Sequence, residues 1–179
     1  MVIGNRRDRY TLPIPGRHNV VNALAAIGVA REMGLTMAEI ARGLEAVDLT
    51  GMRLEITSAG GIKIINDSYN ASPASTRAAL QTLADIAAGG RKIAVLGDML
   101  ELGQRALPGH QEVGAAATGL QIDYLITVGE LAQNIQRGAH SAGMDQGRAS
   151  TVRIIRKRPR SWKIFSSRVI QCWLKDPEA

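Results

Sequence analysis

The sequence predicts an α/β protein, in which an open Rossmann-like sheet with its helices follows a helical hairpin. Three observations carry this prediction. Apolar residues recur at helical spacing up to residue 50, short apolar runs alternate with helical segments from Arg53 onward, and polar residues gather where those runs end. Strands that alternate with helices are typical of a parallel sheet, which we expect to be covered on both faces.

The first 50 residues predict two helices after a short strand or loop. Apolar residues at intervals of three and four over 18–33 indicate the first helix, which Gly34 ends. Thr36 and Glu39 form a capping-box pattern that begins a second helix, reaching about Val47. The spacing in the first helix is carried by Val21, Leu24, Ala25 and Val29.

From residue 53 the pattern changes to short strands. The segment 53–67 predicts a β-hairpin that turns at Ala59-Gly60-Gly61, and Ser72-Pro73 predicts the start of a helix. The remaining expected elements are a helix over 75–88, a strand over 91–99, a helix over 108–120, a strand over 123–130 and a helix over 131–143.

Polar residues and glycine stand at the carboxyl ends of the predicted strands. Asp67, Asp98 and Gly129 each follow a strand, and ligands of α/β sheets bind beyond such ends. No GxxxxGK[ST] pattern occurs in the 179 residues, and the glycines of GGRKIAVLG precede a strand instead of following one. The residues alone therefore predict a polar ligand-binding rim without a phosphate loop or a dinucleotide fingerprint.

Composition excludes several classes of protein. No apolar run approaches the roughly 18 residues of a membrane span, and the amino terminus has no signal-peptide pattern. A single cysteine rules out a disulfide framework and a cysteine-based metal site. With 45% hydrophobic and 21% charged residues the chain is typical of a globular protein, for which a cytoplasmic location is our expectation.

The net charge of +6 comes from residues 151–179. The chain has 22 basic and 16 acidic residues, of which this tail holds eight and two, so residues 1–150 hold 14 of each. The tail also holds both tryptophans, the phenylalanine and the cysteine. A basic segment with aromatic residues leaves open a nucleic-acid-binding or membrane-surface module, which steep salt-dependent binding to DNA would favour.

Four blocks of the sequence resemble the Mur ligase family, in its order and spacing, over about residues 12–140. The DSYNASP variant is similar to that of the members which add D-alanyl-D-alanine to UDP-N-acetylmuramoyl-tripeptide. An amide ligase of the folylpolyglutamate type, from the same superfamily, is an alternative against which this variant argues. The blocks are PGRHNVVNALAA (15–26), GMRLE (51–55), INDSYNASP (65–73) and VLGDMLELG (95–103).

The resemblance implies an ATP-dependent amide ligase of peptidoglycan synthesis. With ATP and Mg²⁺, such an enzyme converts a peptide carboxylate into an acyl phosphate, and the incoming amine then attacks it, giving an amide, ADP and phosphate. By the same resemblance, residues 1–50 are the helical hairpin that ends the central ATPase domain, and 51–150 are the Rossmann-like carboxyl-terminal domain. The phosphate loop, the metal ligands and the UDP-binding domain would lie outside this chain, which would be inactive alone, and the intact enzyme would be a monomer.

The resemblance also assigns nucleotide contacts to matching positions. Asn22, with His18 and Asn19 beside it, would lie against adenine, since an amide is a matched donor–acceptor pair for a base edge. Arg53 would be the catalytic residue that reaches the γ-phosphate, and Asp67 would accept hydrogen bonds from the ribose. The alternatives are a solvent-facing Asn22 and a surface ion pair of Arg53 with Asp67, which would contribute at most about 1 kcal/mol.

On the substrate side of the cleft, the resemblance places Tyr69 and Asn70. We expect His110, in the first turn of a helix, to have a structural role. Asp98 and Glu101 are two carboxylates on one loop, which are more often solvated than bound to magnesium, and we predict no metal site in this chain.

The tail departs from the family, whose chains end in a helix and a strand with a motif like LVKGSR. Read from the third base of each codon, the codons of CWLKDPEA (172–179) permit LVKGSRG, and extension back to Arg158 permits a preceding Ala/Leu helix and a PGD turn. We therefore expect a frameshift near residues 145–157, a disordered tail over 151–179, and an open strand edge in the sheet. Slow amide exchange across 151–179 would contradict the expected disorder.

Overall fold

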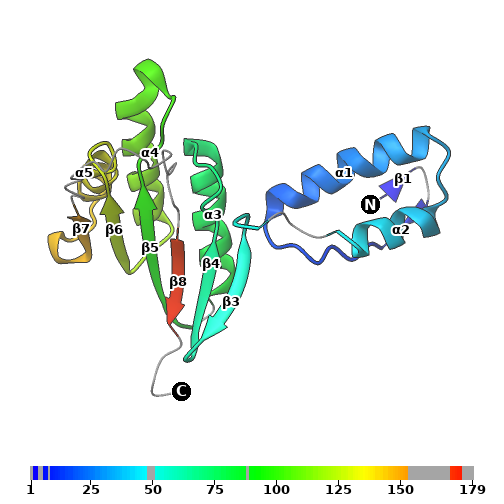
Figure 1. Ribbon diagram of the computed structural model, residues 1–179, viewed down its shortest axis with the longest axis horizontal. Coiled ribbons are helices and arrows are strands. Elements are labelled where there is room, and N and C mark those ends of the chain that lie inside the picture. The colour runs from blue at the N-terminus through cyan, green and yellow to red at the C-terminus, as the bar shows by residue number, and fades with distance from the viewer. Residues whose placement is uncertain are drawn as a thin grey trace, which may run out of the picture. The chain divides into compact units, whose positions relative to one another are not determined.

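The protein folds as two units, residues 1–50 and 51–179, which are both drawn in Figure 1. None of the helices in the described ranges combines the length and the hydropathy that a membrane crossing requires. The computed structural model describes residues 2–3, 6–7, 9–47, 51–87 and 89–152, and the backbone of 170–174.

The first unit is a helical hairpin, as predicted. Gly34, with a φ of 86°, follows the end of the first helix, and the predicted capping box begins the second. The Thr36 hydroxyl and then its backbone N–H donate to the Glu39 carboxylate, and these bonds lower the pKa of Glu39. The elements are β1 (Val2–Ile3), β2 (Arg6–Arg7), α1 (Arg17–Glu32) and α2 (Met37–Glu45).

The core of the first unit uses a different face of α1 from the one that the apolar spacing indicated. Ile27 packs with Ile40 and Leu44 of α2. The residues of the predicted spacing are all exposed: Val21, Leu24, Ala25 and Val29. The spacing predicted the helix but not its core-facing side, because α1 carries apolar residues on several sides and the spacing does not tell which side α2 covers.

The second unit contains a six-stranded sheet in the order β3-β4-β8-β5-β6-β7. β5, β6 and β7 are parallel, whereas β3–β4 is the predicted antiparallel hairpin and β8 is antiparallel to both of its neighbours. The α/β class is confirmed, but the sheet is mixed where a parallel one was expected. The strands are β3 (Glu55–Ala59), β4 (Ile62–Asn66), β5 (Arg91–Gly97), β6 (Tyr124–Val128), β7 (Ala149–Val152) and β8 (Ile170–Leu174).

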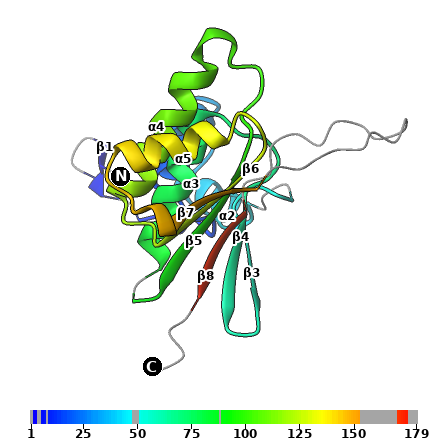
Figure 2. The ribbon, with the colours of Figure 1, turned by 90° about the vertical axis from the view of Figure 1, so that its left-hand side faces the viewer.

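Three helices of this unit, α3 (Pro73–Ile86), α4 (Ala106–Gly119) and α5 (Gln133–Ser141), lie on the same face of the sheet (Figure 2). The connections from β4 to β5, from β5 to β6 and from β6 to β7 all move in the same direction across the sheet. Because such connections are right-handed, their helices lie on the same face. The expectation of helices on both faces is wrong for the part of the chain that the structure describes. Two short 3₁₀ turns complete the elements, η1 (Gly103–Arg105) and η2 (Gln146–Arg148).

The β3–β4 hairpin turns through two glycines. Gly60 and Gly61 have φ values of 57° and 79°, the pair of left-handed conformations that a two-residue type I′ turn requires. Because the turn has two residues, Glu55 pairs with Asn66 at the open end of the hairpin. The turn thus determines which residues meet beyond that end.

Residues 170–174 form a strand, and the expectation of disorder over 151–179 is wrong for them. β8 pairs with β4 from Ile62 to Asn66 and with β5 from Arg91 to Val95. Both neighbours present a row of backbone donors and acceptors, so a strand that enters between them satisfies two edges at once. Residues 151 and 152 belong to β7, while 153–169 and 175–179 lie outside the described residues. The expected frameshift near residues 145–157 therefore lies partly outside them.

Helices α4 and α5 cross at two glycines. A methyl group at Gly114 would overlap the Ile135 carbonyl oxygen, and one at Gly138 would overlap the backbone of Gln111. Backbone atoms cannot move aside as a flexible side chain can, so glycine is required at both positions. This close contact fixes α5, and with it the loop that leaves β6, against α4.

Substituting Gly114→Ala should therefore lower the free energy of unfolding by about 3 kcal/mol, at the upper end of the cost of overpacking. Urea unfolding followed by circular dichroism measures this. Gly119→Ala, in the same helix with open space around it, is the matched control and should be neutral or slightly stabilising. Equal stability of the two variants would contradict the close crossing.

Candidate functional site

The carboxyl ends of three strands lie at one edge of the sheet. β4 and β5 run in the same direction because β8 is antiparallel to both, and β6 is parallel to β5. Asp67, Asp98 and Gly129, which follow these strands, therefore share this edge, as the sequence predicted. The site is built from the loops that leave it.

The segment before β3 is clamped to the segment after β4. The Tyr69 N–H donates to the Met52 carbonyl oxygen at 3.1 Å, and the Leu54 N–H donates to Oδ1 of Asp67 at 3.1 Å. These residue pairs continue the register of the hairpin beyond Glu55, with the Asp67 carboxylate in place of a backbone acceptor. The loop that carries Arg53 is thus held on both sides of this residue.

The backbone on either side of Arg53 is strained. Met52 and Leu54 have φ values of 64° and 47°, a left-handed conformation that costs a non-glycine residue roughly 1–2 kcal/mol. The Leu54 side chain is 6% exposed, so its burial, together with the two clamping bonds, offsets this cost. The GMRLE block gave no sign of this conformation, because the pattern of apolar residues carries no information on φ.

The Arg53 guanidinium lies over the Tyr69 ring, with its carbon 4.2 Å from the ring centroid. At this distance a cation is attracted by the negative face of the ring. Tyr69 is 51% exposed and Arg53 is exposed, so the pair faces solvent at the carboxyl edge. The structure brings together three of the predicted residues, Arg53, Asp67 and Tyr69.

Local hydrogen bonds shape the rest of the loop after β4. Oδ1 of Asn66 accepts from the Ser68 N–H and hydroxyl, and Oδ1 of Asn70 accepts from the Ala71 N–H at 2.8 Å. The predicted start of α3 is confirmed, because Ser72 forms a capping box with Ser75. Asn70 is exposed beside this turn.

The other predicted nucleotide contacts belong to the first unit, at the start of α1. Asn19 is buried, its Nδ2 donates to the Pro15 carbonyl oxygen at 2.6 Å, and its Oδ1 accepts from Nδ2 of Asn22 at 3.3 Å. The side chain of Asn19 therefore supports the first turn of the helix. Asn22 is exposed and His18 is half-buried. Their contact with adenine stays a prediction.

His110 has a structural role. It is completely buried, and its Nε2 accepts from the Met99 N–H at 3.0 Å. Since the Ala106 carbonyl, 2.5 Å from Nδ1, can only accept, the neutral ring carries its proton on Nδ1. The ring thus joins the loop after β5 to the first turn of α4.

Asp98 and Gly129 are packed directly on each other. Oδ1 of Asp98 accepts from the Ala132 N–H at 2.7 Å, and a methyl group at Gly129, whose φ is 128°, would overlap this carboxylate. Asp98 therefore fixes the turn before α5. Glu101 is exposed, and within the ranges that the structure describes no three His, Cys, Asp or Glu side chains gather as a metal site.

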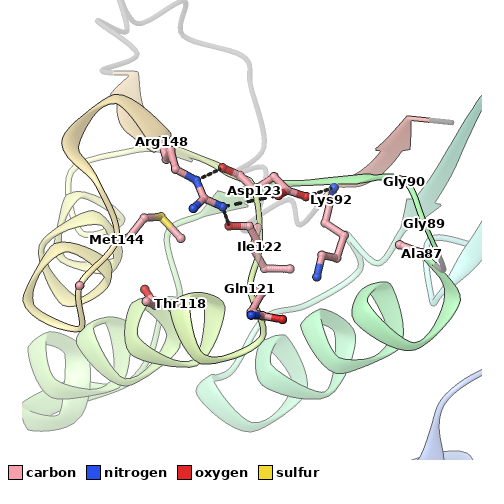
Figure 3. A pocket seen from close by; sticks show the side chains of 11 residues that line it. Ala87, Gly89, Gly90, Lys92, Thr118, Gln121, Ile122, Asp123, Met144 and Arg148 are labelled. Atoms are coloured by element: carbon pink, nitrogen blue, oxygen red, sulfur yellow. Dashed lines mark hydrogen bonds and ion pairs between the residues drawn. The ribbon is translucent and has the colours of Figure 1, made fainter. Parts of the chain in front are cut away.

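A pocket of about 500 Å³ lies at the opposite, amino-terminal edge of the sheet (Figure 3). Lys92 donates from Nζ to the Leu120 carbonyl at 3.1 Å and from its N–H to Asp123 at 2.7 Å. Arg148 donates to the carbonyls of Ile122 and Asp123 at 3.1 and 2.8 Å. Both cations hold the segment between α4 and β6 in place, so we assign these two side chains a structural role.

The loops at the carboxyl edge coincide with the part of the chain that matches a protein family. Residues 52–165 match the model described as "Mur ligase, glutamate ligase domain". The chain belongs to the Mur ligase family. The resemblance seen in the four sequence blocks is confirmed, and the Mur ligase match begins one residue before Arg53.

Curated Mur ligases of one activity are similar to this chain. The UDP-N-acetylmuramoyl-tripeptide–D-alanyl-D-alanine ligase of Bacillus subtilis is 45% identical over 133 residues, which cover 74% of this chain and 29% of that protein. The ligase of the same name from Escherichia coli is 41% identical over 120 residues, covering 66% and 26%. The chain thus spans under a third of the length of these relatives.

A solved structure of MurF from Acinetobacter baumannii is similar in fold. The TM-score is 0.71 with 32% sequence identity, and the alignment covers 79% of this chain and 29% of that one. MurC from Thermotoga maritima, at 24% identity and a TM-score of 0.65, shares the fold. The predicted Rossmann-like Mur ligase domain is confirmed.

Substituting His110→Ala should lower the free energy of unfolding by about 2–4 kcal/mol, because it leaves a buried N–H without an acceptor and opens a cavity. His140→Ala is the control, since His140 is half-buried and bonds one carbonyl, and it should cost about 1 kcal/mol. ¹⁵N NMR of the wild-type ring should find the proton on Nδ1, and a proton on Nε2 at neutral pH would contradict the assignment.

Proposed function

We propose that this chain is the carboxyl-terminal part of an ATP-dependent ligase that joins D-alanyl-D-alanine to UDP-N-acetylmuramoyl-tripeptide. The identity to relatives of that activity supports the choice of substrates. The observation that carries the proposal is the cluster of Arg53, Asp67 and Tyr69 at the carboxyl edge. A cytoplasmic location stays a prediction of the sequence.

The residues present fit a nucleotide. ATP supplies the phosphoryl group that converts the tripeptide carboxylate into an acyl phosphate, with ADP released. The amine of D-alanyl-D-alanine then attacks the acyl carbon, and phosphate leaves as the amide forms. Arg53 offers planar N–H donors to the transferring phosphoryl group, where a cation stabilises the charge that develops. The Asp67 carboxylate, which accepts from the Leu54 N–H, is an acceptor of the kind that ribose hydroxyls donate to.

The clamp holds Arg53 in the position in which it would stabilise the transition state. A cation contributes most to a transition state when it is already held where charge develops, because no reorganisation then occurs during the reaction. The turn at Met52 and Leu54 is fixed by hydrogen bonds to the loop after β4, so the root of the Arg53 side chain is held before a nucleotide binds. Tyr69 and Asn70, exposed on the same loop, would face the peptide substrates.

The proposal places the main phosphate and metal contacts outside these residues. The sequence contains no GxxxxGK[ST] pattern, and the described side chains form no group that fits Mg²⁺. Within this chain, the contacts with ATP are assigned to the second unit's Arg53 and Asp67. The 179 residues by themselves should not catalyse amide formation.

Arg53→Ala should weaken the binding of ATP to the 179-residue chain about 10- to 100-fold, which corresponds to the loss of a hydrogen bond to a charged group. Isothermal titration measures the affinity. Arg77→Ala, which removes an exposed arginine of α3 in the same unit, is the control and should change the affinity less than twofold. If the two substitutions weaken ATP binding equally, Arg53 acts only through the net charge of the surface, which would contradict its role as a phosphate ligand.

A chimera tests the activity itself. If the matched stretch of the Bacillus subtilis ligase is replaced by the corresponding residues of this chain, the product should release phosphate only when ATP, the tripeptide and D-alanyl-D-alanine are all present. The Arg53→Ala chimera should lose this activity and keep its fold. A folded but inactive parent chimera, or full activity of the 179-residue chain alone, would contradict the proposal.

A further inference from the structure

The contact between Tyr69 and Arg53 suggests a task for the tyrosine that the resemblance did not assign. We infer that Tyr69 is a positioning residue, whose ring holds the Arg53 guanidinium in the orientation that binds phosphate. The inference rests on the proposed function and extends it, because there Tyr69 only faces the substrates. It is carried by the distance of 4.2 Å between the guanidinium carbon and the ring centroid, and by the clamp between the two loops.

The clamp fixes the backbone of both partners. The Tyr69 N–H is bonded to the Met52 carbonyl, and the next residue along the chain from Met52 is Arg53 itself. On the other side the Leu54 N–H is bonded to Asp67, two residues before Tyr69. The two backbone segments that carry Arg53 and Tyr69 are therefore joined by hydrogen bonds of the protein itself, and the contact between the two side chains is a product of the local fold.

An exposed arginine otherwise samples many rotamers. Its long side chain loses this freedom when it binds an anion, and the loss weakens binding unless the side chain is already ordered. The Tyr69 ring orders the Arg53 side chain in advance through the attraction between cation and ring face. Positioning in this sense raises the affinity without any contact between tyrosine and phosphate.

A ring is a suitable support for a phosphate-binding arginine. The five N–H donors of a guanidinium point outward in its plane, and a phosphate approaches along that plane. A ring beneath the face leaves these donors to the phosphate, whereas a carboxylate partner takes two of them. Stacking and phosphate binding are thus compatible, and we expect both at Arg53 in the liganded state.

The test uses the 179-residue chain, ¹⁵N labelling of the arginine side chains and tripolyphosphate as the probe. Without the probe, the Arg53 Nε–Hε signal should show an upfield ring-current shift that Tyr69→Phe retains and Tyr69→Leu abolishes. In titrations, Tyr69→Leu should weaken tripolyphosphate binding about three- to fivefold, the range of an exposed cation–π contact, and Tyr69→Phe less than about twofold. In an Arg53→Ala background, Tyr69→Leu should have no further effect.

The outcomes separate this inference from the proposed function. If the Arg53 signal does not respond to tripolyphosphate in the wild-type chain, the proposed phosphate contact is wrong and the inference is overturned with it. If the signal responds but Tyr69→Leu leaves the affinity unchanged, only the inference is overturned. The same holds if Tyr69→Phe weakens binding as much as Tyr69→Leu, because the hydroxyl and not the ring would then be responsible.

Discussion

The register of the β3–β4 hairpin is the constraint on which the candidate site depends. Two consecutive left-handed glycines, Gly60 and Gly61, make the turn two residues long, and Glu55 then faces Asn66. Continued outward, the same register brings Leu54 to Asp67 and Met52 to Tyr69. A slip by one residue would reverse the faces of the strand and remove both bonds. A turn at one end of the hairpin thus determines the chemistry at the other.

In the turn around Arg53, the cost of backbone strain is offset by side-chain burial and hydrogen bonds. Left-handed backbone at Met52 and Leu54 is unfavourable, and a buried leucine with two hydrogen bonds to the facing loop stabilises it. Strain of this kind concentrates where a side chain must be held in one direction. The position of Arg53 therefore depends on the residues that contact this turn, since an isolated GMRLE segment would not favour these φ values.

Local chemistry made part of this molecule predictable from the sequence. The capping boxes at Thr36 and Ser72 and the two-glycine turn involve residues within three positions of each other, so their patterns are visible in the sequence. Whether Val21 or Ile27 of α1 faces the core depends on a second helix, and the stacking of Tyr69 on Arg53 depends on the hairpin. The insertion of 170–174 depends on two open strand edges. These outcomes follow from residues far apart in the sequence, which spacing and composition do not relate.

The place of β8 has a consequence for how the chain acquires its structure during synthesis. β4 and β5 are made early, but in the finished sheet each bonds β8, and neither bonds the other. Until the ribosome has released residues 170–174, the β3–β4 hairpin and the β5–β6–β7 ribbon are two separate pieces with unpaired edges. Pairing of such sequence-distant strands is slow and leaves those edges exposed to other nascent chains in the meantime. The exposure of these edges therefore lasts until β8 has been synthesised.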